Sequence, residues 1–356
     1  MCSIGGVFSK TGADVYPFLL DLLFSQRHRG SEGFGITVGG KTVKSEKISG
    51  IQSNFLKGGF GICHSLLSVT GHSIQPLSSS NRKFHLAHNG QIYNFREIGG
   101  AGLSNDSESI VKFLSTSPQK NLPMFFKKAV GSFACALAEQ NSISAFRDTL
   151  GIKPVWFGEN SEIFAFASEP LALKKLNIGF PVPLLPGHII HFSKKGIFQK
   201  KVFDLKDFRK TVPKNSNFEY LFSSFLKAVD YRTAGIKKCG VFFSGGVDSS
   251  TIAKAVSGRV GETVLFTAGI AGSSDIVFSD RAANALGLKL VATEIQKDEL
   301  PQLSLQVLSS LGFFDLMQLG IALPIFVCAR EAQKRGLRDV FSGQGSDEVF
   351  CGYSSY

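Results

Sequence analysis

The chain has 356 residues, 43% of them hydrophobic, which predicts about two globular domains with a core each. Its net charge of +11 comes from scattered lysines and arginines without a dense basic block, which argues against a nucleic-acid groove. No apolar run is long enough to span a bilayer, no signal peptide is visible, and the six cysteines form no CxxC pair. We therefore expect a soluble cytoplasmic protein with reduced thiols.

The first half of the sequence predicts short strands with turns between them. Residues 3–8 predict a strand, and the apolar residues of 15–23 recur at the spacing of an amphipathic helix. A second helix is predicted over 104–114. Further strands are predicted at 34–38, 42–48, 61–69, 83–88, 132–139, 142–147, 155–158 and 163–168. Many strands with two helices indicate a layered α+β domain.

Residues 35–42 match the pattern of a phosphate-binding Walker loop, GxxxxGKT. That motif binds phosphate only where it joins a strand to a helix. Here both flanks look like strands around Gly39-Gly40-Lys41, so the sequence predicts a hairpin instead.

The second half alternates strands with helices. Strands are predicted at 239–243, 263–268, 289–295 and 339–341, with helices at 249–257, at 280–286 and up to Arg335 between them. This alternation indicates a parallel, doubly wound α/β sheet. All seven histidines precede residue 192, which excludes a His-ligated metal in this half.

The composition changes to charged and polar residues between the halves. We therefore predict a domain over 2–200, a linker over 201–217 that contains Pro213, and a second domain over 218–356.

Cys2 directly follows the initiator methionine. Loss of Met1 would leave a cysteine with both a thiol and a free α-amine, whose ordinary pKa of about 7.7–8.0 lets it accept the thiol proton. Further polar motifs follow in order: His28-Arg29-Gly30, His88-Asn89-Gly90-Gln91, Asp106-Ser107-Glu108, Arg147-Asp148, Gly151-Ile152-Lys153-Pro154 and Ala167-Ser168-Glu169.

This series resembles the glutamine amidotransferases of the N-terminal nucleophile type (class II) from Cys2 to about residue 190. The resemblance implies a stacked αββα fold in which Cys2 attacks the glutamine carboxamide, giving a thioester and ammonia. Asn89 and the Gly90 N–H would form the oxyanion hole, which stabilises developing negative charge. Asp106 would hold the substrate ammonium group, and Leu67, Val69 and Gln91 would complete the glutamine site.

Two positions depart from that family. Leu66 stands where the family has an arginine that clamps the glutamine α-carboxylate, and Gln91 replaces a glutamate. A hydrogen bond to a charged group contributes about 1.5–3 kcal/mol, so its loss weakens glutamine binding unless another cation substitutes. We therefore expect weak or absent glutaminase activity.

The second half contains Ser244-Gly245-Gly246-Val247-Asp248-Ser249 between a predicted strand and a predicted helix. Glycines let the backbone approach a phosphate, and the helix N-terminus and serine hydroxyls donate hydrogen bonds to it. The pattern SGGxDS is typical of the pyrophosphate-loop ATP enzymes, which cleave ATP between its α and β phosphates.

Together with Ser342-Gly343-Gln344-Gly345-Ser346-Asp347, this makes almost the whole chain similar to the glutamine-hydrolysing asparagine synthetases. The resemblance implies that ATP and aspartate form β-aspartyl-AMP, which ammonia then attacks. Asp248 and Asp347 match the family's Mg²⁺ ligands, since hard oxygen donors suit that ion. The remaining positions implied to bind ATP are Phe242, Ser244, Gly245, Gly246, Asp248, Ser249, Ala268, Ser342 and Gly343.

Gln344 replaces a glutamate of the family and lacks the basicity to accept a proton. Relatives continue with a helical segment that helps bind the acceptor acid, so we expect a domain truncated at its C-terminus and assign no acceptor pocket. Two other functions stay open: an amide-forming relative on another carboxylate with an inactive glutaminase half, and a non-catalytic nucleotide-binding fragment. A homodimer is implied by family likeness.

Overall fold

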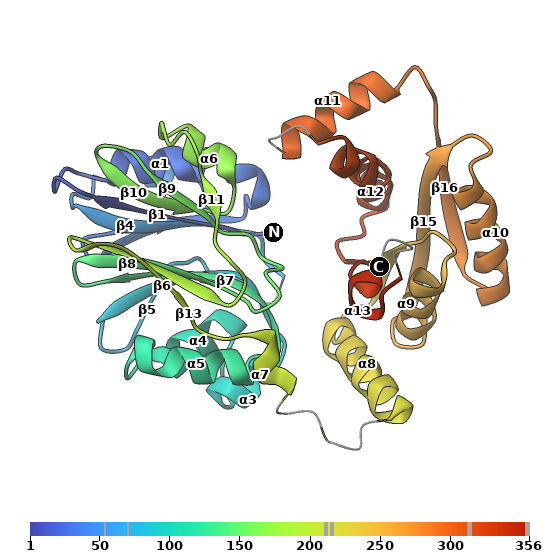
Figure 1. The fold of residues 1–356 in the computed structure, drawn as a ribbon, viewed down its shortest axis with the longest axis horizontal. Coiled ribbons are helices and arrows are strands. Elements are labelled where there is room, and N and C mark those ends of the chain that lie inside the picture. Colours follow the sequence, from blue (N-terminus) through green and yellow to red (C-terminus); the bar gives the residue numbers. More distant parts are fainter. Residues whose placement is uncertain (53–54, 70, 210–212, 214–216, 312–314, 353–356) are drawn as a thin grey trace. The chain divides into compact units, whose positions relative to one another are not determined.

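A computed structural model describes residues 1–356 except 53–54, 70, 210–212, 214–216, 312–314 and 353–356. The chain forms two compact units, Met1–Lys214 and Asn215–Tyr356 (Figure 1). The predicted linker contains a short helix, α7 (Leu205–Arg209), and the end of strand β13. Its residues 210–212 and 214–216 lie outside the described part.

The first unit stacks two antiparallel sheets on each other (Figure 1). The first sheet has the order β11 (Val182–Pro183), β9 (Trp156–Glu159), β10 (Ile163–Ala167), β1 (Ser3–Ser9), β4 (Phe60–Leu66), β2 (Gly33–Val38), β3 (Lys41–Ser45). The second has the order β13 (Gly196–Lys201), β12 (His188–Ser193), β8 (Ser142–Arg147), β7 (Gly131–Glu139), β6 (Phe84–Ile92), β5 (Leu77–Ser78).

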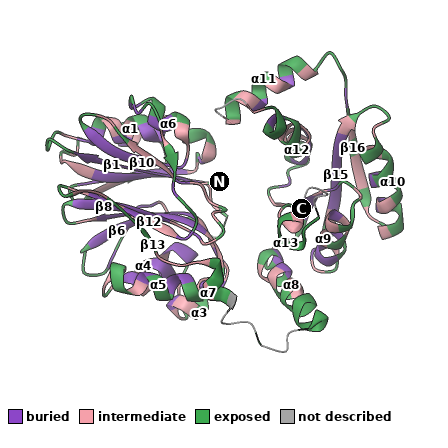
Figure 2. Ribbon diagram, viewed as in Figure 1, coloured by how far each residue is buried: buried purple, intermediate pink, exposed green. Residues whose placement is uncertain are grey.

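Helices cover the outer faces of both sheets, which gives the four layers of the predicted αββα sandwich. The first sheet packs against α1 (Tyr16–Ser25), α2 (Ile48–Gln52) and α6 (Pro170–Lys174). A 3₁₀ turn, η1 (Arg27–Arg29), follows α1. The second sheet is covered by α3 (Phe95–Gly99), α4 (Asp106–Leu114) and α5 (Pro118–Lys128). Figure 2 shows the strands of both sheets as largely buried.

The side chains between the two sheets explain the alternation along the strands. Ile4 and Phe8 of β1 and Ile62 of β4 are buried against Ala134 and Ala136 of β7. Small alanines on one sheet face large side chains on the other, so the layers interdigitate. Each large buried side chain contributes about 1.5–3 kcal/mol to stability.

The Walker-like segment is a hairpin, as predicted. Strands β2 and β3 pair in antiparallel register from Val38–Lys41 to Phe34–Ser45. Gly39 and Gly40 make the turn with φ of 55° and 83°, values that favour glycine. No helix follows Lys41, so the segment is not a Walker loop.

Several predicted boundaries in this unit are wrong. The strand predicted over 42–48 ends at Ser45, and Ile48 begins α2, which buries Ile51 in the core. The expectation of two helices missed α5, where Leu122, Phe125 and Phe126 form the buried face in spite of Pro123. Pro118 at the start of α5 and Pro123 inside it masked the helical periodicity in the sequence.

The second unit contains a parallel sheet, as predicted, with the order β16 (Lys289–Ile295), β15 (Glu262–Ile270), β14 (Lys238–Phe242), β17 (Val340–Phe341). Its helices are α8 (Phe218–Thr233), α9 (Val247–Ser257), α10 (Ser274–Leu286), α11 (Leu300–Leu311), α12 (Leu316–Lys334) and α13 (Ser346–Phe350).

Both faces of this sheet are covered. Val241 and Leu265 pack against Ala253 of α9 and Ala283 of α10. Phe266, on the opposite face, packs against helices α11 and α12. This arrangement places the carboxyl ends of β14, β15 and β17 at one edge of the sheet, where parallel α/β sheets bind their ligands.

None of the described helices is by itself long and apolar enough to cross a membrane. Helices α11 and α12 are long and apolar enough only when taken together, and the two helices lie at 105° to each other.

Candidate functional site

Cys2 lies at the start of β1, where the strand opens on a cavity of about 120 Å³. Its Sγ is 3.3 Å from the Leu67 N–H, which donates to it, and 3.5 Å from the Leu67 carbonyl oxygen. Burial raises the pKa of the thiol, while the Leu67 N–H and the N-terminal amine lower it. The thiol is thus held against the chain that follows β4.

All the residues predicted for the glutamine site line this one cavity. They are Cys2, Leu67, Val69, Asn89, Gly90, Gln91 and Asp106. They come from positions far apart in the sequence, and the sandwich brings them together because β1 and β4 pair in the first sheet while β6 ends beside them in the second.

Asn89 and Gly90 of β6 have the features needed to bind an oxyanion. Asn89 is 1% exposed, and its Nδ2 has no hydrogen-bond partner among the described residues. Gly90 has a φ of 157°, and a Cβ there would meet the Ser132 carbonyl oxygen at 2.2 Å. A buried amide donor without a partner costs free energy, so its presence on a cavity wall indicates a ligand.

Asp106 is the first residue of α4 and is 6% exposed. Its Oδ2 accepts a hydrogen bond from the Ile92 N–H at 2.9 Å. Burial raises the pKa of this carboxyl to about 6, although that bond and the Ser107 N–H lower it. At neutral pH it is therefore a buried anion on the cavity wall, suited to a substrate ammonium group.

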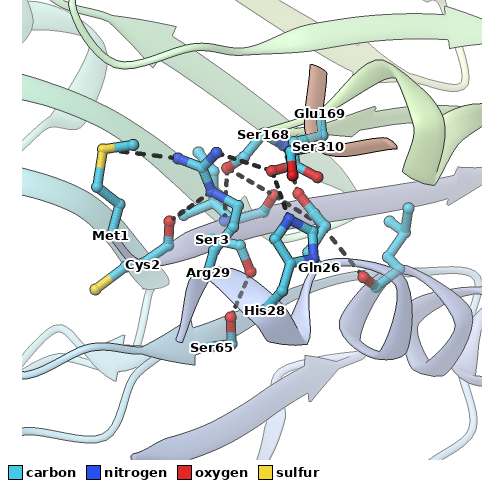
Figure 3. Close-up of polar contacts among 12 residues, drawn as sticks. Met1, Cys2, Ser3, Gln26, His28, Arg29, Ser65, Ser168, Glu169 and Ser310 are labelled. Atoms are coloured by element: carbon cyan, nitrogen blue, oxygen red, sulfur yellow. Dashed lines mark hydrogen bonds and ion pairs between the residues drawn. The ribbon is translucent and has the colours of Figure 1, made fainter. Parts of the chain in front are cut away.

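The side chain of Arg29 holds the main chain of Cys2 by a hydrogen bond (Figure 3). Its Nε donates to the Cys2 carbonyl oxygen at 3.1 Å, and its Nη1 donates to Glu169 Oε1 at 2.9 Å. The Nε2 of His28 lies 3.0 Å from the same Glu169 oxygen. Both motifs are visible in the sequence, but nothing in the sequence shows that they meet at Cys2.

Both departures from the family also lie on the cavity wall. Leu66 is 4% exposed and Gln91 is partly buried, so an apolar and a neutral side chain stand where the family has charges. Lys153, which was not assigned a role, lines the same cavity. Burial is the main cause that lowers the pKa of Lys153, and the nearby Arg29 lowers it further.

The second unit has a cavity of about 410 Å³ at the carboxyl edge of its sheet. The predicted residues on its wall are Phe242, Ser244, Asp248, Ser249, Ala268, Ser342, Gly343 and Asp347. Gly245 and Gly246 belong to the same loop but are not on the wall. Gln344 lines the cavity as well.

The loop from Ser244 to Gly246 is shaped by close packing. Gly245 has a φ of 77°, and a Cβ there would lie 2.6 Å from the Phe278 backbone. Ser249 Oγ lies 3.3 Å from the Ser244 N–H, which donates to it. The eleven-residue helix α9 begins directly after Gly246, so its free N–H groups face the region of the loop. The arrangement fits a phosphate.

Asp248 and Asp347 reach this cavity from α9 and α13, which makes them suitable for Mg²⁺. The described residues contain no cluster of three or more His, Cys, Asp or Glu side chains that would hold a metal by themselves. A two-carboxylate site fits Mg²⁺ that takes its other ligands from water and phosphate oxygens.

Fold and cavities together define a class: an N-terminal nucleophile sandwich of the class II amidotransferase type, joined to a parallel-sheet unit of the pyrophosphate-loop type. Residues 64–175 match the family model described as "Glutamine amidotransferase domain", and residues 221–356 match the one described as "Asparagine synthase".

Curated relatives match over the whole chain. A provisionally named glutamine-hydrolysing asparagine synthetase 1 of Methanocaldococcus jannaschii is 28% identical, covering 100% of this chain and 70% of that protein. Asparagine synthetase B of Escherichia coli is 26% identical, covering 99% and 65%. Over almost its whole length the chain is thus similar to glutamine-hydrolysing asparagine synthetases. It spans from 49% to 70% of the length of the curated relatives it matches.

Among solved structures, the glutamine phosphoribosylpyrophosphate amidotransferase of B. subtilis superimposes with a TM-score of 0.50 at 18% identity. The match covers 82% of this chain and 65% of that one, and it supports the fold alone.

Proposed function

We propose that this chain is an ATP-dependent amidotransferase that releases ammonia from glutamine and uses ATP to convert aspartate to asparagine, AMP and pyrophosphate. One observation carries the proposal: each half of the predicted machinery converges on a single cavity in its own unit. A non-catalytic fragment would not need an unpartnered Asn89 amide beside a thiol.

In the first unit, the Cys2 thiolate attacks the carboxamide carbon of glutamine. Asn89 Nδ2 and the Gly90 N–H bind the oxygen on which negative charge develops, and Asp106 binds the α-ammonium group. The amide C–N bond then breaks, and ammonia leaves with a proton delivered by the α-amine of Cys2, which is free once Met1 has been removed. Water hydrolyses the thioester to glutamate.

In the second unit, the loop at Ser244–Gly246 and the start of α9 bind the ATP phosphates, and Phe242 and Ala268 contact the nucleoside. Asp248 and Asp347 would hold Mg²⁺, which neutralises charge on the pyrophosphate leaving group. The aspartate carboxylate attacks the α-phosphorus, pyrophosphate leaves, and ammonia displaces AMP from the acyl phosphate. Gln344 accepts no proton, so ammonia must arrive uncharged. We also propose a homodimer, on family likeness alone.

The test measures pyrophosphate release and asparagine formation by the full chain with ATP, Mg²⁺ and aspartate, and with either glutamine or ammonium. We expect asparagine from both nitrogen sources, with a poor KM for glutamine because of Leu66 and Gln91. Turnover with another carboxylic acid in place of aspartate would instead support an amide-forming relative. No pyrophosphate under any condition would refute the proposal.

A further inference from the structure

Lys153 is a cation on the wall of the glutamine cavity for which the proposed reaction has no use. Its backbone is fixed, because Asp148 accepts hydrogen bonds at 3.1 Å from the N–H groups of Leu150, Ile152 and Lys153. Asp148 is 3% exposed. The loop after β8 therefore presents the lysine side chain from a rigid base.

The ammonium group of Lys153 lies beside the nucleophilic end of the chain. Its Nζ is 3.5 Å from Met1 Sδ, and Met1, Cys2 and Lys153 line the same cavity. Among the described residues no carboxylate lies within ion-pair distance of it. A partly buried cation without an anionic partner is unfavourable for folding. Cys2 and Asp148 both act to raise the pKa of Lys153, and of these two groups only Cys2 lines the cavity with it.

Other groups around the thiol act in both directions. The charged and titratable groups near the Cys2 thiol come from several elements. They are the N-terminal amine, Lys153 from the loop after β8, Arg29 of η1, Glu32 before β2, His88 of β6 and Asp106 of α4. Asp106 raises the pKa of the thiol and Lys153 lowers it. Burial lowers the pKa of His88 to about 3, so its ring is uncharged at neutral pH.

We propose that Lys153 is a positioning residue that holds Cys2 in its reactive thiolate form, offsetting the opposite effect of burial and Asp106. The inference rests on the proposed function for its purpose, since a thiolate is the form that attacks an amide. The role needs a positive charge at this point and no particular hydrogen-bond geometry.

The test follows alkylation of Cys2 by iodoacetamide over a series of pH values, with peptide-level mass spectrometry of the full chain. We expect Lys153→Met to move the midpoint up by about one pH unit and to slow alkylation at pH 7 roughly tenfold. Lys153→Arg keeps the charge and should behave like the unmodified chain. Cys351, which is exposed, provides an internal control in every sample.

Lys10→Met is the matched control, because Lys10 follows the far end of β1 and pairs with Glu159 at 2.6 Å. It should leave the Cys2 profile in place. An unchanged midpoint in Lys153→Met, or equal shifts in Lys153→Met and Lys153→Arg, would overturn the inference. So would a raised KM for glutamine with no pH shift, which assigns Lys153 to substrate binding. A shifted profile in a chain without glutaminase activity would support the inference and count against the proposed function.

Discussion

The two cavities would bind their proposed ligands by different means. The first is small, and buried side chains define it: Asn89, Asp106 and His88 are at most 6% exposed. The second is larger, about 410 Å³ against 120 Å³, and its phosphate-binding part is a main-chain loop at a helix start. A side-chain site depends on individual residues for catalysis. A main-chain site depends on loop shape and a few carboxylates, so the two units should respond differently to substitution.

The sharpest separation of the units comes from Cys2→Ala. Removing the nucleophile should lower glutamine-driven pyrophosphate release by at least about 10³-fold and leave ammonium-driven release unchanged. Both rates are measured on one preparation. Cys351→Ala, which alters an exposed cysteine outside the cavity, should change neither rate. Glutamine-driven turnover that survives Cys2→Ala would remove the basis of the donor site.

Asn89→Ala tests the unpartnered amide. We expect kcat for glutamine hydrolysis to fall by about 10²- to 10³-fold, because one oxyanion donor is lost. The urea midpoint should stay nearly constant, since Nδ2 has no partner among the described residues to lose. A parallel loss of stability and activity would point to a structural role for Asn89.

Asp248→Asn tests the second cavity. Pyrophosphate release should fall about 10²-fold with either nitrogen source, because the charge that would hold Mg²⁺ is removed. Glutamine hydrolysis assayed alone should be retained. Asp280→Asn, in the exposed part of α10, is the control. Equal effects of the two changes would show that Asp248 has no special role.

Leu66→Arg restores the guanidinium that the family has at this position. It should sharpen the contrast between the side-chain site of the first unit and the main-chain site of the second. The KM for glutamine should fall by about tenfold if the new charge binds the α-carboxylate. Leu66→Met introduces length without charge and should leave KM unchanged. A higher KM for the arginine variant would mean that the cavity no longer has room for both groups.

Asp106→Asn should change the stability of the fold in a pH-dependent way with a defined sign. The native carboxyl has its pKa raised from 3.8 to about 6, so its ionised form destabilises the folded state, and stability falls as pH rises between these values. The amide should therefore stabilise the protein by about 3 kcal/mol at pH 7 and by almost nothing below pH 4.

The same substitution should raise the KM for glutamine. Urea unfolding at the two pH values checks the stability claim. Stabilisation that does not depend on pH would show that the carboxyl is not the cause.

Most site residues of the second unit fall in two short motifs, each directly after a strand, which made the members of each motif predictable from the sequence. Ser244, Asp248 and Ser249 share one strand–loop–helix segment, and Ser342, Gly343 and Asp347 follow the strand that pairs with β14. Parallel strands end at the same edge, so the two motifs meet at one cavity.

The sequence by itself determined the two folds, the strand–helix alternation and the candidate residues, because hydrophobic periodicity and short motifs are local properties of the chain. Only the tertiary structure decided which polar groups meet. It joined Arg29 and Glu169 to the main chain of Cys2, left Asn89 Nδ2 unpartnered and brought Lys153 to the cavity that the thiol lines. These contacts depend on sheet pairing across more than a hundred residues, for which no local pattern exists.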